Sequence, residues 1–363
     1  CIPLTSVDIA KATTIGDEAF AECEELADVN MPLVTTIGDR AFYSCRELIE
    51  VDLPEVVTIE NSAFSDCSNI ETINIPNATS IGEYAFSSVT QLLNVDLPEA
   101  ETIGRGAFEN CESLISISAP EVSIIEEWTF RNCINLVSID IPKVTTIDEE
   151  AFEDCQSIES LDLPKVETIE PFTFNSCTSL TNVNMPVVTS IGSYAFGNCN
   201  ELNSITLGET VPAVSSSSAF NDISSDSPTI YVPYGSAISY EEDTSDGDGT
   251  DDEWYGWTIY EMSNDATLSS LSISAGTLDP TFDSSIINYE AEVTNDVDSI
   301  EVTPEANDSN ATVTIEGETV TSGEAEEVAL SVGTNEINIV VTAEDGSTTS
   351  ETVITVTRAA SDD

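Results

Sequence analysis

Apolar and polar positions alternate in a pattern that returns every 22 residues over residues 1–207. One complete unit, Cys133 to Asp154, reads CINLVSIDIPKVTTIDEEAFED. About ten such units follow one another in the same register. A fixed period of 20 to 29 residues is typical of a solenoid, in which each repeat forms one turn of a stack.

The first half of the unit predicts a short strand. Leu136, Ile139 and Ile141 share an extended segment, and Asp140 points to the opposite face, because successive side chains of a strand alternate. Pro142 ends the segment, since proline has no N–H to donate to a neighbouring strand. The spacing L-x-x-L-x-L therefore predicts a leucine-rich-repeat solenoid, built mostly of strands with short turns or 3-10 segments.

The second half of the unit predicts another extended segment and a turn. Val144 to Ile147 form the segment, and the unit closes on Ala151 and Phe152 before the next cysteine. One repeat cannot bury these apolar side chains alone, so neighbouring repeats must supply the stability. Glycine marks the turn in five repeats, at Gly16, Gly38, Gly82, Gly104 and Gly192.

Cysteine occurs only at the first position of the repeat. A column that accepts Val89 in mid-run is selected for small apolar volume rather than for thiolate chemistry. The spacing also contains no C-x-x-C pair, so we predict buried free thiols and neither disulfides nor a metal site. The column consists of Cys1, Cys23, Cys45, Cys67, Cys111, Cys133, Cys155, Cys177 and Cys199.

The motif I-G-x-x-A-F-x-x-C-x-x-L, with a strand that ends in proline, resembles the BspA-like leucine-rich repeats of microbial surface proteins. The resemblance covers Cys1 to about Leu207. It implies an extracellular or cell-surface protein for adhesion or binding, without catalytic activity. The segments Thr229 to Pro233 and Trp254 to Trp257 look like the end cap of that family.

The period breaks in residues 208–263, which we predict to cap the solenoid. Thr229 to Pro233 should add a capping strand, and Tyr240, Trp254 and Trp257 should cover the open end of the core. Serine runs on either side of Ala219 and Phe220 mark loops.

An acidic run, Glu241 to Glu253, interrupts this cap. A Ca²⁺ loop needs oxygen ligands at alternating positions and a glycine at the sharp turn. Asp246, Asp248 and Asp252 meet part of that pattern, but Thr244 stands where the first aspartate is needed. Calcium is the one cofactor that the sequence suggests, and a disordered acidic insert is the other interpretation.

The period changes to simple alternation in residues 264–358. About seven short apolar-polar segments with intervening turns predict an antiparallel β-sandwich. The stretch Leu268 to Gly276, followed by Leu278, Phe282 and Tyr289, resembles the cadherin-like β-sandwich domain of bacterial surface proteins. That resemblance implies a spacer rather than a ligand site.

Both ends of the chain suggest a longer protein. Cys1 lies in repeat register, so a further repeat or cap is expected before it; a lipidated Cys1 is the rival interpretation. Residues 359–363 form a polar linker or tail that resembles the lead-in Ser263 to Thr267, so a second sandwich is expected after it. A fraying C-terminus is the alternative there.

The charge of the chain is extreme: 68 Asp and Glu oppose eight Lys and Arg, histidine is absent, and the net charge is −60. Nucleic acid and anionic membrane surfaces require cationic groups, so we exclude both as partners. The sequence contains no apolar run of about 18 residues that would span a membrane. Such a surface suits a saline or calcium-rich exterior.

One polar position of the repeat should point outward from the sheet. Stacked carboxylates about 4.8 Å apart repel by about 0.8 kcal/mol in water. Aspartate mostly alternates with a neutral residue there, and we favour a solvated face that avoids like-charge stacking over a binding face for a cationic or hydroxyl-rich partner. The column consists of Asp8, Asn30, Asp52, Asn74, Asp96, Ser118, Asp140, Asp162, Asn184 and Thr206.

Aromatic residues occur just before the Ala-Phe position in four repeats, at Tyr84, Trp128, Phe172 and Tyr194. Exposed aromatics can anchor an interface. We favour the alternative, in which they pack over the turn of the next repeat.

The chemistry of an enzyme is mostly missing. Without histidine, neither a Ser-His-Asp nor a Cys-His arrangement can form. Carboxylate pairs abound, as a glycosidase would need, but nothing in the sequence places a pair in a pocket.

We therefore expect a secreted or cell-surface binding protein whose partner is a surface protein or glycan of a host or neighbouring cell. The alternative is a self-associating structural subunit of a surface layer or filament.

The thiol hypothesis predicts a titration result. The unfolded, unreduced protein should release close to nine free thiols to a colorimetric thiol reagent. Finding eight of nine oxidised would refute the apolar-column interpretation.

The charge predicts that stability depends on salt or calcium. The Debye length, over which charges repel one another, is about 10 Å at 0.1 M salt and about 3 Å at 1 M. Because repulsion between carboxylates weakens, the melting temperature should rise between these concentrations. If calcium alone raises it, Asp246, Asp248 and Asp252 are the first residues to substitute. An unchanged melting temperature, with and without chelator, contradicts both versions.

Overall fold

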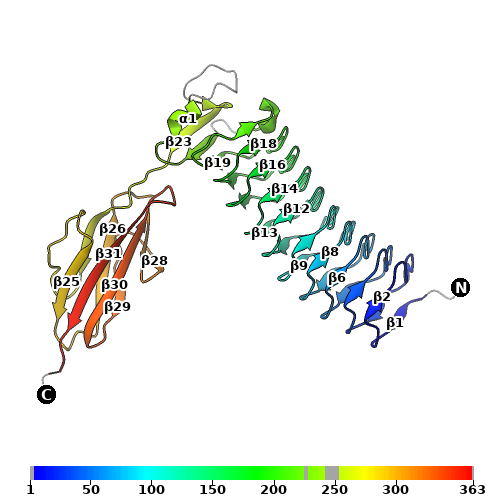
Figure 1. Cartoon of the computed structure of the whole chain (residues 1–363), viewed down its shortest axis with the longest axis horizontal. Coiled ribbons are helices and arrows are strands. Elements are labelled where there is room, and N and C mark those ends of the chain that lie inside the picture. Colours follow the sequence, from blue (N-terminus) through cyan, green and yellow to red (C-terminus); the bar gives the residue numbers. More distant parts are fainter. Residues whose placement is uncertain (1–3, 225–227, 242–252, 362–363) are drawn as a thin grey trace. The chain divides into compact units, whose positions relative to one another are not determined.

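A computed structural model describes residues 4–224, 228–241 and 253–361. The chain forms two compact units. The first contains residues 1–231 and 238–260, and the second contains residues 232–237 and 261–363. Figure 1 shows a solenoid with its end cap in the first unit and a β-sandwich in the second.

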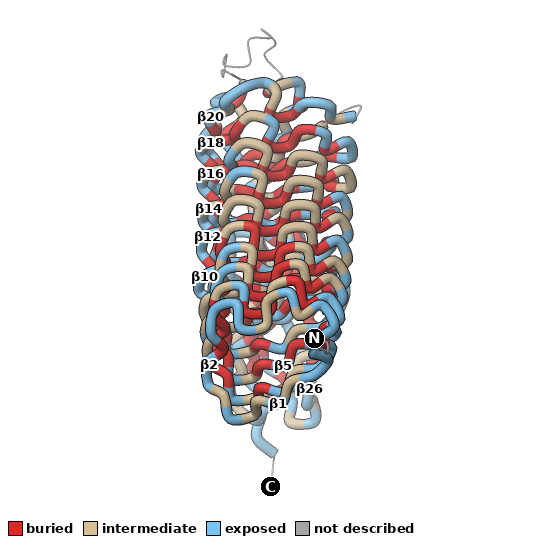
Figure 2. Tube along the Cα trace, turned by 90° about the vertical axis from the view of Figure 1, so that its right-hand side faces the viewer, coloured by how far each residue is buried: buried red, intermediate tan, exposed pale blue. Residues whose placement is uncertain are grey.

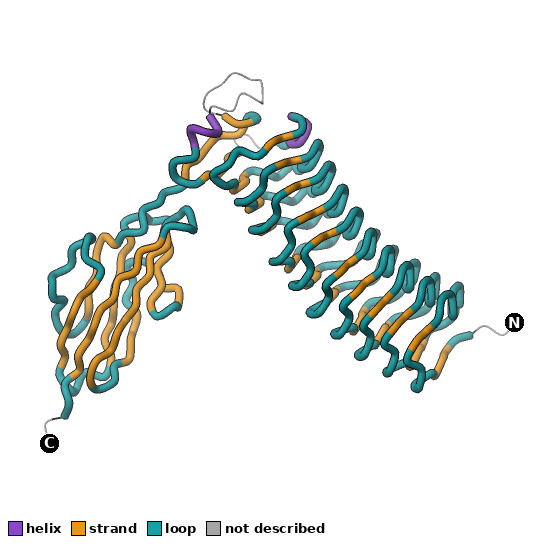
Figure 3. The backbone as a smooth tube through the Cα atoms, viewed as in Figure 1, coloured by secondary structure: helices purple, strands orange, loops and turns teal. Residues whose placement is uncertain are grey.

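Each repeat contributes one three-residue strand to a row of parallel strands that we call the front sheet (Figure 3). Each residue lies opposite its equivalent in the next repeat, as Ser116 does with Ser138. The row divides into blocks β1–β3, β5–β13 and β15 onward. The strands are β1 (Ser6–Asp8), β3 (Asp28–Asn30), β5 (Glu50–Asp52), β7 (Thr72–Asn74), β9 (Asn94–Asp96), β11 (Ser116–Ser118), β13 (Ser138–Asp140), β15 (Ser160–Asp162), β17 (Asn182–Asn184) and β19 (Ser204–Thr206).

The leucine at the start of the motif lies outside this strand, contrary to the sequence prediction. The backbone N–H of Leu136 donates to the carbonyl of Cys133 at 3.0 Å, so Leu136 belongs to a turn. Its side chain is nevertheless fully buried. The apolar spacing therefore identified core positions correctly but overestimated the length of the strand.

Two-residue strands form a second parallel row, the side sheet. Nine of these strands recur with the 22-residue period. In each of them a β-branched residue fills the inward position, as Ile15 and Ile147 do. The strands are β2 (Thr14–Ile15), β4 (Thr36–Ile37), β6 (Thr58–Ile59), β8 (Ser80–Ile81), β10 (Thr102–Ile103), β12 (Ile124–Ile125), β14 (Thr146–Ile147), β16 (Thr168–Ile169), β18 (Ser190–Ile191) and β20 (Ala213–Val214).

The interior of the stack is filled by columns of apolar side chains, shown as buried segments in Figure 2. The phenylalanine column is continuous from Phe20 to Phe220, with centroid separations from 5.2 to 5.9 Å between neighbouring rings. Offset aromatic pairs at this separation contribute about 0.5–1.5 kcal/mol beyond their burial. Main-chain bonds follow the same column, as from the Phe86 N–H to the Ala107 carbonyl at 2.8 Å.

The cysteine column lies beside the phenylalanines. The eight cysteines of the described residues form no disulfide. Seven of them donate through Sγ to a phenylalanine carbonyl 25 residues earlier, as Cys111 does to Phe86 at 3.2 Å. Burial raises the pKa of the Cys111 thiol to about 12, so the neutral thiol is the form present at physiological pH.

Each turn contains two residues in the left-handed backbone region, four positions apart. Glu150 and Asp154 have φ values of 56° and 61°. The glycines predicted to form the turn do not occupy these positions. Four of them, all except Gly16, are required by close approach instead: a Cβ on Gly192, for example, would lie 2.5 Å from the Pro171 nitrogen.

The end cap continues the front sheet and covers the core. It comprises η1 (Ser217–Phe220), β21 (Thr229–Val232), α1 (Ala237–Glu241), β22 (Glu253–Trp254) and β23 (Trp257–Glu261). Strand β21 pairs with β19 in parallel, as the prediction of a capping strand requires.

Aromatic residues of the cap complete the apolar columns. The Tyr240 hydroxyl donates to the Gly208 carbonyl at 2.8 Å. The ring centroids of Trp254 and Trp257 lie 5.7 and 5.5 Å from that of Phe220, the last ring of the phenylalanine column. All three predicted cap aromatics are thus buried over the end of the core. The proposed calcium residues Asp246, Asp248 and Asp252 lie outside the described residues.

The second unit is a sandwich of two sheets. The order is β24-β26-β29 in one and β25-β31-β30-β27-β28 in the other, and every pairing is antiparallel except the parallel pair β25–β31. The strands are β24 (Leu268–Ile273), β25 (Asn288–Val293), β26 (Ser299–Ala306), β27 (Thr312–Ile315), β28 (Glu318–Val320), β29 (Glu326–Ala329), β30 (Gly333–Thr342) and β31 (Thr349–Arg358).

The stack predicts unequal costs for two phenylalanines of one repeat. Phe174→Ala removes a fully buried ring from the column and should lower the free energy of unfolding by about 3–5 kcal/mol. Phe172→Ala removes a partly exposed ring that stacks on Tyr194 and should cost about 1 kcal/mol. Denaturant unfolding measures both, and equal costs would contradict the buried column.

Candidate recognition surface

The predicted polar column lies on the exposed face of the front sheet. Four of its five neutral members donate hydrogen bonds to the aspartates of adjacent repeats. Asn30 donates to Asp8 at 3.1 Å, and Asn74 donates to Asp52 at 2.7 Å. Further along, Asn184 donates to Asp162 at 2.7 Å and Ser118 to Asp140 at 3.3 Å. Alternation thus replaces carboxylate repulsion with a charge-assisted hydrogen bond.

One adjacent like-charged pair and one unpaired aspartate stand out in this column. Asp140 and Asp162, the adjacent pair, lie on β13 and β15, and the front sheet divides between these strands. Like-charge repulsion does not explain the other division of the front sheet, between β3 and β5, because the neutral Asn30 lies next to Asp52 there. The Asp96 carboxylate accepts no hydrogen bond within the described part of the chain, because Ser118 donates to Asp140 instead. Asp96 is therefore available to a partner.

A shallow groove of about 460 Å³ crosses the front sheet from β7 to β13. Asp96, Asp140 and Ser118 line it together with Leu93 and the strand-centre residue Ile73. Strands β7 and β9 share only one register pair, whereas β9 and β11 share three. Ile73 is partly exposed, while its equivalents in the next two repeats are buried. The groove therefore includes a point where adjacent strands of the front sheet pair only partly.

Leu93, at the position just before the strand, lines this groove and begins a row of exposed aliphatic residues whose other members are not part of the groove lining. Leu93, Ile115 and Val137 occupy it in three successive repeats and are 38%, 45% and 49% exposed. Glu71 and Glu159 stand at the same position in the flanking repeats.

The next position of the same three repeats is uncharged, with Asn94, Ser116 and Ser138. We call these six residues the neutral strip: Leu93, Asn94, Ile115, Ser116, Val137 and Ser138. The strip was not predicted from the sequence, although three aliphatic residues at one repeat position were a signal for it. On a chain of charge −60, an uncharged surface of this kind marks a candidate contact region.

The aromatic residues at the turn pack against adjacent repeats, as predicted. A Cβ on Gly106 would lie 2.5 Å from the ring of Tyr84, so that ring rests on the glycine of the next repeat. Phe172 and Tyr194 stack with their centroids 5.2 Å apart. These rings therefore form part of the stack.

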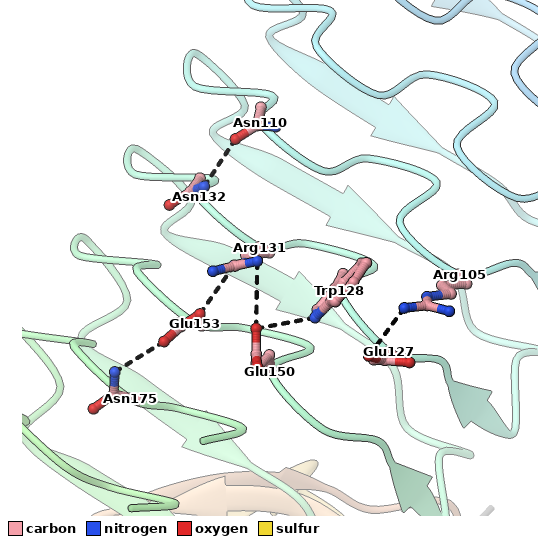
Figure 4. A network of polar contacts seen from close by, with 9 residues as sticks. All are labelled: Arg105, Asn110, Glu127, Trp128, Arg131, Asn132, Glu150, Glu153 and Asn175. Carbon is pink, nitrogen blue, oxygen red and sulfur yellow. Dashed lines mark hydrogen bonds and ion pairs between the residues drawn. The ribbon is translucent and has the colours of Figure 1, made fainter. Parts of the chain in front are cut away.

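Trp128 lies at the centre of a polar network that joins three repeats (Figure 4). The guanidinium of Arg105 lies 4.0 Å from the ring centroid and that of Arg131 lies 5.7 Å away. The indole N–H donates to Glu150 at 3.0 Å. Arg131 also lies 2.9 Å from Glu153, whose pKa is raised by burial. Partly exposed contacts of this kind contribute about 1 kcal/mol or less each.

Several cations of the chain, in this network and elsewhere, are engaged by carboxylates or main-chain carbonyls and so do little to offset the remaining negative charge of the surface. Arg105 contacts Glu127 at 3.1 Å, and Lys143 contacts Glu121 at 2.6 Å. In the sandwich, Arg358 donates to the main-chain carbonyls of Asn295 and Leu330. The exposed potential is therefore dominated by carboxylates.

Neither a membrane-spanning helix nor a metal-binding cluster appears in residues 4–224, 228–241 and 253–361. No helix there is long and apolar enough to cross a bilayer. No three carboxylate or thiol side chains of these ranges converge as a metal site would require.

The polar column predicts a salt-dependent effect. Asn74→Asp exchanges a hydrogen-bond donor for a third successive carboxylate, and should lower the free energy of unfolding by about 1–2 kcal/mol at low salt. The control Asn182→Asp adds the same charge between Ser160 and Ser204 and should cost less than about 0.5 kcal/mol. The difference should shrink in 1 M salt; equal costs at low salt would exclude like-charge stacking.

Several bacterial proteins are similar to this chain. A leucine-rich-repeat protein of Bacteroides ovatus is 31% identical, with a TM-score of 0.47, over 56% of this chain and 61% of that chain. A leucine-rich-repeat protein of T. pallidum is 29% identical, with a TM-score of 0.41, over 43% and 78%. A protein of Evansella cellulosilytica named "Putative membrane protein" is 44% identical over 99 residues, or 26% of this chain. This chain spans 15% of the length of that curated relative.

Family profiles match both units. The BspA type leucine rich repeat region matches residues 1–115 and 101–226, with six copies. The cadherin-like beta sandwich domain matches residues 268–359. The repeat match extends over more than half of the chain and agrees with the stacked 22-residue turns. The chain therefore belongs to the BspA-type leucine-rich-repeat proteins and carries a cadherin-like β-sandwich domain.

Proposed function

We propose that the chain is a non-catalytic adhesion module of a secreted or cell-surface protein. The front sheet is its recognition face, and the sandwich is a spacer. The neutral strip carries this proposal, because it exposes three aliphatic side chains in a row on a strongly acidic chain. The membership in a family of surface repeats supports the location.

The residues of the groove favour binding over catalysis. A glycosidase needs one carboxyl group whose pKa is raised in a secluded site. The candidate carboxylates Asp96 and Asp140 are both exposed. The absence of histidine from the chain removes the commonest general base. Recognition of a partner requires only the shape and polarity that the front sheet already has.

A binding screen tests the proposal. The purified chain should bind at least one member of a panel of glycans, matrix proteins and whole cells. The isolated sandwich domain, residues 261–363, is the control and should not bind. Protease shaving of intact cells should release the protein if it lies on the surface.

Two outcomes would contradict the proposal. One is the absence of any ligand in the screen. The other is concentration-dependent polymerisation of the pure chain in light scattering, which would favour a structural subunit of a surface layer instead.

A further inference from the structure

We infer that the neutral strip and Asp96 bind a basic amphipathic helix of a partner protein. This inference rests on the proposed function, because it names the partner of the same recognition face. Three observations support it: the aliphatic row, the spacing between its members, and the carboxylate of Asp96 beside it.

The chemistry of the strip favours a protein over a glycan. Leu93, Ile115 and Val137 offer aliphatic surface, and the groove contains no aromatic ring against which a sugar face could stack. Their neighbours Asn94 and Ser116 are already engaged with each other, since the Ser116 hydroxyl donates to Asn94 at 2.7 Å. Apolar contact is therefore the main interaction that the strip can offer.

The spacing of the row favours a helix over a strand. Adjacent repeats lie about 4.8 Å apart, so Leu93 and Val137 are separated by about 9.6 Å. Side chains at positions i and i+7 of a helix are separated by about 10.5 Å along its axis, with one between them at i+3 or i+4. Residues on one face of a strand recur about every 6.8 Å, a spacing that does not match the distance of about 4.8 Å between adjacent repeats.

The charge of the partner follows from Asp96. Asp52, Asp140 and Asp162 accept hydrogen bonds from asparagine or serine of an adjacent repeat, whereas Asp96 has no such partner among the described residues. Asp96 lies three residues after Leu93, or about 10 Å along the strand, which is within reach of a lysine or arginine on the flank of a helix. A charge-assisted hydrogen bond would fill its acceptor sites.

A second copy of this chain does not fit the strip. Its net charge of −60 opposes close approach to Asp96. The α-helix of the described residues, α1, contains five residues, which is too short to span three repeats. The occupant is therefore a different, basic protein.

Designed helical peptides test this inference with the full chain in 0.15 M salt. The probe has leucines at i, i+4 and i+7 with flanking lysines. One control peptide replaces the leucines with glutamine, and a second replaces the lysines with glutamate. The leucine-lysine helix should bind at least tenfold more tightly than either control, as measured by fluorescence anisotropy.

Matched variants locate the contact. Ile115→Ser combined with Val137→Ser should weaken binding at least tenfold, or about 1.4 kcal/mol. Ile49→Ser, at the same repeat position but outside the strip, should leave it unchanged. Asp96→Asn should weaken binding several-fold, whereas Asp162→Asn, which removes the same charge from the same column, should not. Circular dichroism confirms that each variant is folded.

Several results would overturn the inference. If the glutamine control binds as tightly as the probe, the attraction is general and electrostatic. A tighter complex with an extended alternating leucine-lysine peptide would exclude the helix. Failure of the probe to bind, or equal binding by all variants, would exclude the strip. A screened ligand that tolerates the strip variants would leave the proposed function intact and remove only this inference.

Discussion

Contact between successive repeats is the interaction on which the solenoid depends. A strand of three residues has no stability of its own, and each repeat buries its apolar side chains only against its neighbours. The phenylalanine column joins repeats by ring contact, and the cysteine column joins them by Sγ–H bonds to carbonyl groups. Both columns continue until the cap, where Trp254 and Trp257 cover Phe220.

This stacking separates the inward positions of each repeat from the outward ones. Inward residues are constrained by volume, which is why Val89 can replace a cysteine without a gap. Outward residues are constrained mainly by their equivalents in the next repeat. The aspartate column satisfies that constraint by pairing carboxylates with amides, as at Asp52 and Asn74. In the neutral strip, aliphatic residues follow one another in three successive repeats and remain exposed.

The repeat made much of this fold predictable from sequence. Once the period is known, burial at one repeat predicts burial at the others, so the core columns and the outward face of Asp140 follow directly. The cap aromatics were predictable because large rings in a polar segment need an apolar surface to cover. The packing of Tyr84 and Phe172 on the next repeat was predicted for the same reason.

Other features depend on three-dimensional register and could not be predicted. Glu150 and Asp154 have left-handed backbone, and their N–H groups donate to the carbonyls of Pro171 and Asn175 in the next repeat, an arrangement that glutamate in particular does not signal in the sequence. Asp96 differs from the other aspartates only through the direction in which Ser118 donates. The parallel pairing of β25 with β31 joins distant segments that alternation alone cannot order.

Native-state hydrogen exchange tests the central claim, that one stacked frame supports an independent outward surface. The amides of Phe42, Phe64 and Phe86 each donate to the alanine carbonyl of the following repeat. They should exchange together, through a common unfolding event, and equally in the wild type and in the variant with Ile115→Ser and Val137→Ser. Separate exchange of single repeats, or a loss of protection in the variant, would contradict the account.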